Sequence, residues 1–539
     1  MEFVWVLLFV FCDLKVMYDI IIKNGTIIDG TGGEMYRADI GIKEDKIVKI
    51  GDLQNEKWEV EIDATDKLIC PGFIDVNNHS DTYWQIFNNP NLESLVYQGI
   101  TTIVGGNCGS SLAPLADAGT ISSIQKWSNI REATFNWLTL KEFFKVLEKK
   151  KLSVNFATLV GHGTLRRGIL KEQIESPNQK ELAFMDKMLK KSLKEGALGM
   201  STGLIYTHAR SASTEELINL AKIIKKYNGV YVTHIRNEEE KFIEAVKEVI
   251  QIAKEAKVKT HISHLKVMGE KNWHLMDEAL FLIAKANENG LDITFDVYPY
   301  TNTGTVLYTL LPAWVSEGGK NVMINRLRDP KIRIKIIEEM RESRVDYSKI
   351  DIAISSLDKT LSKRNIEDIA RSQEKSAEDA VLDILIASEG RVITSMEVLS
   401  RENVEKAIIN PQSIIGSNGS GYDIAHAKTG ELVHPRNFGT FVKILARFVL
   451  GKRIISWEEA IRKMTLLPAE KFGLKKRGKI AEKYFADILI INRDEIEDLA
   501  TVDNPYQYSR GIEFVLVNGY IVMSDGKYTG VRNGEIIRK

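Results

Sequence analysis

The sequence predicts an α/β protein in which a central β/α barrel is joined to a small β-sandwich built from both chain ends. Short β-branched runs broken by turns fill residues 18–69 and return at 486–523. Between them, apolar runs alternate with amphipathic helical stretches, the pattern of a parallel sheet. At 539 residues the chain is also too long for one ordinary core, so more than one domain is expected.

The two ends of the chain match each other in pattern. In the first part, the predicted strands are 18–22, 26–28, 38–42, 46–50 and 59–62. In the last part they are 486–491, 512–517 and 520–523, with Asn518-Gly519 as a tight hairpin turn. We therefore expect residues 17–72 and 465–539 to form one sandwich.

The middle of the chain, residues 73–464, carries the predicted barrel. Its candidate strands are 73–76, 101–104, 156–160, 199–201, 230–233, 260–263, 292–297, 392–393 and 414–415, with helices such as 215–227, 239–256 and 276–289. A closed barrel of eight such units typically needs about 250 residues. We assign the excess mainly to a helical insert at about 301–350.

Composition restricts the partners and the compartment. The chain is 44% hydrophobic and 27% charged, as is typical of globular proteins, and its 73 basic residues equal its 73 acidic ones. A net charge of zero argues against nucleic acid or an anionic membrane as a partner. Three cysteines (Cys12, Cys70 and Cys108) are too few for a disulfide framework, which favours a reducing, cytoplasmic location.

The first sixteen residues contain an apolar run at 3–12. They lack the basic flank and the small-residue cleavage site of a signal peptide, and the run is too short to span a bilayer. The natural beginning is MYDIIIKNGTIIDGTG, so we expect Met17 to be the true start and residues 1–16 a mis-assigned extension.

Metal-binding residue types follow several predicted strands. His79 follows the first strand, Cys108 the second, His234 the strand 230–233 and His264 the strand 260–263. If the strands close a barrel, these side chains meet at its mouth. Taken singly, Cys108 fits a buried small hydrophobe and each histidine a hydrogen-bonded core residue. Together, thiolate and imidazole suit zinc or a similar borderline metal.

Several ordered motifs make residues 17–539 resemble the D-aminoacylase (N-acyl-D-amino-acid deacylase) branch of the amidohydrolase superfamily. They are PGFIDVNNHSD, GITTIVGGNCGSS, EGALGMSTGLIY, YVTHIRNE, THISHLKV, GSNGSG and HPRNFGTF. The resemblance implies a metal-dependent hydrolase with a TIM-like barrel and a β-sandwich. It also implies one Zn²⁺ per chain and a small-molecule N-acyl-D-amino acid as substrate.

The resemblance also implies roles for single residues. Cys108, His234 and His264 would hold the tightly bound zinc, and His79 would belong to a second, weaker metal position. The substrate carboxylate would be bound by Lys266, Tyr298 and Arg436, donors that fit such a group.

The chain departs from the family pattern at two positions. Asn77 stands where the family has the first histidine of His-x-His, and Asn418 stands where it has the aspartate that acts as general base. An amide cannot accept a proton near pH 7. Metal binding is expected to survive, while hydrolysis by the family's route is expected to weaken unless Asp81 or Asp423 acts as the base.

Several functional alternatives stay open at this point. One is a catalytically impaired relative that keeps the fold and the zinc; another is a non-enzymatic binding or assembly protein. A hydantoinase-like or dipeptidase-like substrate is a further alternative, because one scaffold serves many amides in this superfamily. The preference for D over L substrates rests on the resemblance alone, and the sequence predicts no oligomeric state.

Overall fold

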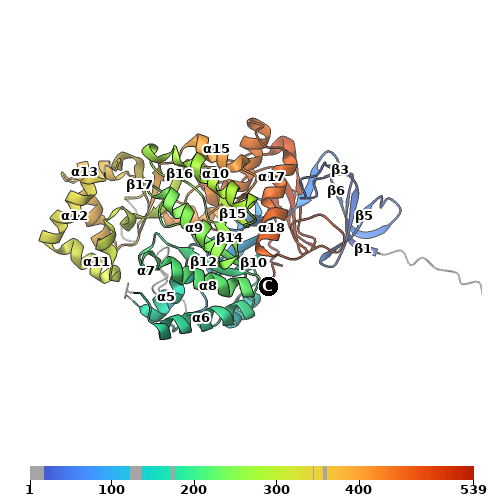
Figure 1. The fold of residues 1–539 in the computed structure, drawn as a ribbon. Helices are drawn as coiled ribbons and strands as arrows, with labels where there is room; N and C mark the ends of the chain where they lie inside the picture. Colours follow the sequence, from blue (N-terminus) through green and yellow to red (C-terminus); the bar gives the residue numbers. More distant parts are fainter. Residues whose placement is uncertain (1–16, 122–135, 172–175, 344, 356–360) are drawn as a thin grey trace, which may run out of the picture.

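The computed structural model describes residues 17–121, 136–171, 176–343, 345–355 and 361–539. The expectation for residues 1–16 therefore lies outside the described residues. Figure 1 shows three parts in a row: the strands β1, β3, β5 and β6 at one end, the barrel in the centre, and α11, α12 and α13 at the other end.

The central part is a ring of parallel strands. Its members are β8 (Phe73–Asp75), β9 (Ile100–Gly105), β10 (Asn155–Thr158), β11 (Val160–Gly161), β12 (Gly199–Gly203), β13 (Val230–His234), β14 (Lys259–Ile262), β15 (Ile293–Val297) and β19 (Ser413–Ile415). Only Leu159 separates β10 from β11. The ring closes where Asn78, after β8, bridges Gly419, after β19, and the His79 amide donates to the Gly419 carbonyl at 2.7 Å. The predicted barrel is confirmed.

Helices connect these strands and cover the ring. The longer ones are α4 (Leu140–Lys150), α5 (His162–Leu170), α6 (Gln179–Lys194), α8 (Thr214–Lys226), α9 (Phe242–Ala256), α10 (Leu275–Glu288), α15 (Arg401–Ile409), α16 (Arg436–Lys443) and α17 (Trp457–Met464). Shorter ones are α1 (Gln85–Asn88), α2 (Glu93–Val96), α7 (Thr207–Arg210) and α18 (Leu466–Phe472). Side-chain hydrogen bonds cap the N-termini of several of these helices. The Ser213 side chain, for example, accepts a hydrogen bond from the Glu216 amide at the beginning of α8.

Both chain ends build the sandwich, as predicted. One sheet has the order β5 (Lys46–Gly51), β4 (Asp39–Lys43), β1 (Met17–Lys23) and β6 (Lys57–Asp63). The other has β23 (Lys527–Tyr528), β22 (Tyr520–Ser524), β21 (Ile512–Val517), β20 (Ile488–Ile491), β7 (Leu68–Pro71), β2 (Thr26–Ile27) and β3 (Tyr36–Arg37). Buried isoleucines from both sheets form one shared core, which holds the two ends together.

The insert between β15 and β19 differs from the expectation. It contains an antiparallel sheet of β16 (Asn302–Val306), β18 (Val392–Glu397) and β17 (Ile350–Ser355), with α11 (Gly319–Arg328), α12 (Pro330–Glu342), α13 (Ile366–Ser372) and α14 (Ala377–Ala387). It is therefore wider and less helical than the 301–350 segment expected, and it has its own apolar core. Residues 392–393, predicted as a barrel strand, lie in β18 instead. The domain limits at residues 72 and 464 stay predictions.

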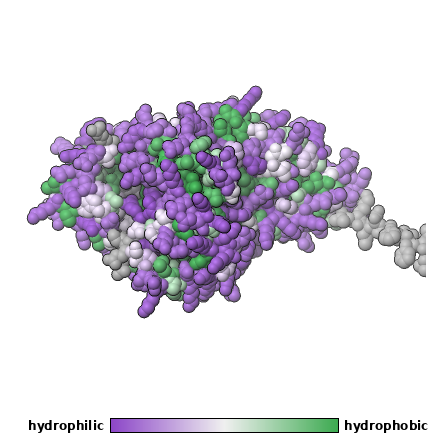
Figure 2. Space-filling view, in the orientation of Figure 1, coloured by the Kyte–Doolittle hydropathy of each residue, from purple (hydrophilic) through white to green (hydrophobic). Residues whose placement is uncertain are grey.

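The outer surface on the face drawn in Figure 2 is mainly hydrophilic, with hydrophobic residues in small scattered groups. Within the described part of the chain, no helix combines the length and the apolar character that crossing a bilayer requires.

Candidate metal centre

The residues expected at the mouth of the barrel do meet there. Each lies at or just after the carboxyl end of a parallel strand: His79 after β8, Cys108 after β9, His234 at the end of β13, His264 after β14 and Asn418 after β19. All of them line one cavity of about 850 Å³. This is the end of a β/α barrel where active sites are built.

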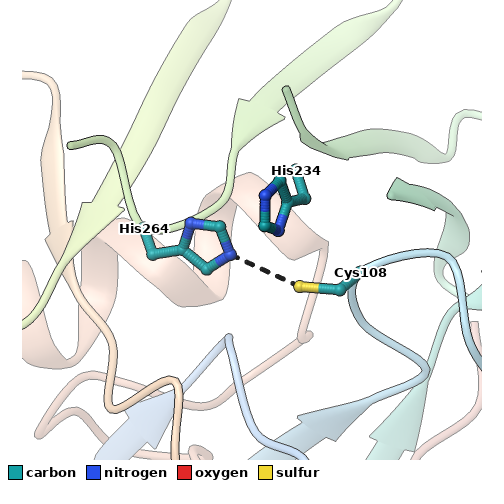
Figure 3. A group of neighbouring side chains, drawn as sticks. All are labelled: Cys108, His234 and His264. Carbon is teal, nitrogen blue, oxygen red and sulfur yellow. Dashed lines mark hydrogen bonds between the residues drawn. The ribbon is translucent and has the colours of Figure 1, made fainter. Parts of the chain in front are cut away.

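Cys108, His234 and His264 form a compact group. One potential ligand atom from each lies within 4.8 Å of the others, and all three residues are buried. Figure 3 shows both imidazole rings close to the sulfur of Cys108. His264 Nε2 lies 3.4 Å from Cys108 Sγ.

The donor set and its hydrogen bonding fit a zinc ion. One sulfur and two imidazole nitrogens are preferred zinc ligands. Both ring nitrogens of His234 are buried without a hydrogen-bond partner, and buried polar atoms normally have one. A cation bound by the three residues would satisfy one of these two nitrogens.

Burial sets the protonation of the site. It lowers the pKa values of His234 and His264 well below their ordinary value, so both rings are neutral at pH 7, the form that binds metals. Burial also raises the pKa of the Cys108 thiol to about 12, although Lys266 opposes the shift. The thiolate that binds a metal therefore needs a cation beside it.

Three residues of the site have strained backbones. The φ angles of Cys108, His264 and Asn418 are 50°, 39° and 48°, in the left-handed region that non-glycine residues rarely adopt. Such strain costs on the order of 1–3 kcal/mol per residue and clusters at functional sites.

The two asparagines bond to neighbours on one side of the site. Asn418 Oδ1 lies 2.9 Å from His79 Nε2. The amide nitrogen of Asn77 lies 3.1 and 3.3 Å from the two carboxylate oxygens of Asp296. His79 Nε2 is 3.9 Å from Cys108 Sγ, and His79 is not part of the compact group found among the described residues.

Comparisons with known proteins agree with this geometry. The model of the amidohydrolase family matches residues 60–523, and that of the urease alpha-subunit N-terminal domain matches residues 12–71. The D-aminoacylase of Alcaligenes xylosoxydans xylosoxydans is 30% identical, with 97% of this chain and 98% of the relative covered. The N-acyl-D-glutamate deacylase of the same organism is 32% identical, with 97% and 96% covered.

This chain belongs to the amidohydrolase family. Its branch is that of the D-aminoacylases and N-acyl-D-amino-acid deacylases. It is a hydrolase acting on carbon–nitrogen bonds other than peptide bonds. A solved structure of N-acyl-D-glutamate deacylase from Bordetella bronchiseptica, complexed with zinc and a phosphonate inhibitor, is 30% identical. Its TM-score is 0.81, with 97% of this chain and 100% of that chain covered.

Two of the three residues that the amidohydrolase resemblance assigns to the substrate carboxylate line the cavity. Lys266 and Arg436 do so, and both are buried. Nε and Nη1 of Arg436 have no hydrogen-bond partner. Tyr298 is not in the cavity wall: its hydroxyl donates to Thr303 at 3.2 Å, and its ring lies 5.3 Å from the Arg436 guanidinium carbon.

The two aspartates considered as replacement bases lie elsewhere. Asp81 accepts the amide hydrogens of Gly106 and Thr82, and Asp423 caps the turn at His426. Neither is among the residues that line the cavity. The alternative that one of them replaces the family aspartate as general base therefore has no support in the structure.

Glu238 also belongs to the site and was not among the residues predicted from the sequence. Its carboxylate lies 2.5 Å from Lys266 Nζ, 3.4 Å from His264 Nδ1 and 3.5 Å from His234 Nε2, and the residue is 4% exposed. A signal was present, since Glu238 lies four residues after His234 in YVTHIRNE.

Proposed function

We propose that this amidohydrolase hydrolyses the amide bond of N-acyl-D-amino acids and holds one zinc ion per chain through Cys108, His234 and His264. The proposal depends mainly on one observation, the buried group of one sulfur and two imidazoles at the floor of the cavity. Relatives named D-aminoacylase and N-acyl-D-glutamate deacylase support the substrate class, and the zinc in the Bordetella bronchiseptica enzyme supports the metal.

The chain's own residues bind and orient the substrate. The unpaired nitrogens of Arg436 suit a carboxylate, and the Lys266 ammonium lines the same wall. Tyr298 stacks against the guanidinium, so we assign it the role of holding Arg436 in place. A zinc ion bound beside Cys108 supplies Lewis acidity, which polarises a carbonyl group and makes water a stronger acid.

A second candidate is a catalytically impaired relative that keeps the fold, the zinc and the ligand pocket. Asn418 favours it, because the amide holds His79 at 2.9 Å but cannot take a proton from water. Asn77, in place of the family histidine, removes a ligand of the second metal position. We infer slow turnover, with the weaker metal position around His79 lost.

The experiment that separates these functions is a zinc-loaded activity screen on N-acetyl-D-amino acids. Each substrate is paired with its L enantiomer, and zinc is measured in the same samples. Hydrolysis restricted to D substrates supports the first candidate. Bound zinc without hydrolysis of either enantiomer supports the second.

The expected cytoplasmic location is consistent with Cys70 and Cys108 both being free thiols.

A further inference from the structure

One oxygen of Glu238 faces the outer nitrogens of both proposed histidine ligands. Glu238 Oε1 lies 3.5 Å from His234 Nε2 and 3.4 Å from His264 Nδ1. The carboxylate is buried, and the loop that carries it is tied to the loop after β14 by a 2.7 Å hydrogen bond from the Met268 amide to the Glu238 carbonyl.

In each of the two histidine rings, the nitrogen that does not face Glu238 is the one available to bind a metal. His264 Nε2 is 3.4 Å from Cys108 Sγ, so its Nδ1 is the nitrogen that faces Glu238. His234 Nε2 is the ring nitrogen 3.5 Å from Glu238 Oε1, and neither it nor Nδ1 has a hydrogen-bond partner. A neutral imidazole carries one proton, and the nitrogen that binds a metal must be the bare one. Each outer nitrogen then carries the proton and needs an acceptor.

We propose that Glu238 is the positioning residue that fixes both histidines in the tautomer able to bind zinc. The inference rests on the proposed zinc site and adds a residue that orients it. Carboxylates that accept from the outer nitrogen of a ligating histidine fix its ring and raise its basicity. Here one carboxylate oxygen lies near enough to both outer nitrogens to serve two ligands.

Lys266 opposes the zinc-binding tautomer of His264, and Glu238 offsets it. Its Nζ lies 3.0 Å from His264 Nδ1, and an ammonium group can only donate. That hydrogen bond alone would keep Nδ1 bare and place the ring proton on Nε2, beside Cys108. Glu238 favours the opposite tautomer because its oxygen, 3.4 Å from Nδ1, would accept a proton held there and also pairs with Lys266 at 2.5 Å. In that tautomer, Nδ1 no longer accepts from Lys266, whose side chain lines the cavity.

The test compares zinc affinities of variants by chelator competition. Glu238→Gln keeps the shape but loses the charge, and Glu238→Met also loses the acceptor. We expect zinc to bind about 10–100-fold more weakly, with the larger loss for Glu238→Met. The absorption spectrum of the Co²⁺-loaded protein should change in both variants. The control is Glu240→Gln, an exposed residue two positions further along the same loop, which pairs with Lys271 at 3.6 Å.

A second set of variants, made in a Lys266→Met protein, distinguishes two roles of Glu238: orienting the histidines and neutralising the charge of Lys266. In a Lys266→Met protein, Glu238→Gln should still weaken zinc binding and change the Co²⁺ spectrum, because both histidines still lose a charged acceptor and keep only a neutral one. An effect that disappears in this background overturns the inference, as does an unchanged affinity and spectrum in folded Glu238→Gln. An unmodified protein that binds no zinc overturns the proposed function itself, a distinct result.

Discussion

Replacing Asn418 by aspartate should restore the missing proton acceptor and raise the rate of amide hydrolysis. Asn418 lines the cavity beside the proposed metal centre, and its side chain already reaches His79 at 2.9 Å. Its φ of 48° is a conformation that aspartate tolerates almost as well as asparagine. The carboxylate can accept the same hydrogen bond from His79, so the substitution adds a base with little structural change.

The size of the effect follows from what a positioned base contributes. General acid–base catalysis typically supplies roughly 10²–10⁴-fold in rate. Each tenfold step corresponds to about 1.4 kcal/mol, so the barrier should fall by roughly 3–6 kcal/mol. The same carboxylate is also a better metal ligand than the amide, so some second-site metal binding around His79 should return.

The assay is release of the free D-amino acid from N-acetyl-D-amino acids by the zinc-loaded protein. Asn418→Gly is the matched control, because glycine accepts the positive φ and supplies no base. It should not raise the rate. The reasoning is refuted if the unmodified protein turns over at about 1–10³ s⁻¹, the range ordinary for enzymes, and Asn418→Asp leaves that rate unchanged.

Three further predictions concern the metal, the substrate and stability. Cys108→Ala should lower the zinc content from about one ion per chain to near zero by elemental analysis, because a thiolate ligand is lost. Arg436→Met should raise KM for N-acyl-D-amino acids about 10–100-fold with a smaller change in kcat, as expected for loss of a charged hydrogen bond of about 1.5–3 kcal/mol. An unchanged KM would remove Arg436 from the substrate site. Burial raises the pKa of Glu216, but His162 and Arg166 outweigh it and lower the pKa to about 2 from 4.5. Its stabilisation, roughly 3 kcal/mol, is therefore complete above pH 4.5 and is lost as pH falls toward 2. Denaturant unfolding of Glu216→Gln should show the full deficit at pH 7 and a shrinking one below pH 4.5; a deficit independent of pH would contradict the assignment.

Much of the fold could be predicted from local pattern. Two patterns depend directly on which faces of the strands and helices are buried: the β-branched runs at the two chain ends and the strand–helix alternation between them. The barrel and the sandwich could therefore be predicted. Residues 392–393 were misassigned because a short apolar run has the same appearance in any buried sheet. Only the pairing of β18 with β16 and β17 shows which sheet it joins.

Site residues at the ends of strands could be predicted from the sequence, whereas residues placed by the conformation of a loop could not. Cys108, His234 and His264 lie at the end of their strands or within three residues of it, so closure of the ring brings them together. Glu238 lies in the loop after β13, and its approach to His264 depends on how two loops fold against each other. The same holds for Asp81, which turns to the Gly106 amide and away from the cavity.

The zinc content of the purified protein decides whether Cys108, His234 and His264 hold a metal. We expect about one zinc per chain by elemental analysis, tightly held in the unmodified protein and lost in Cys108→Ala. A protein that stays free of zinc when zinc is supplied, or that keeps its zinc after Cys108 is replaced, would contradict the account.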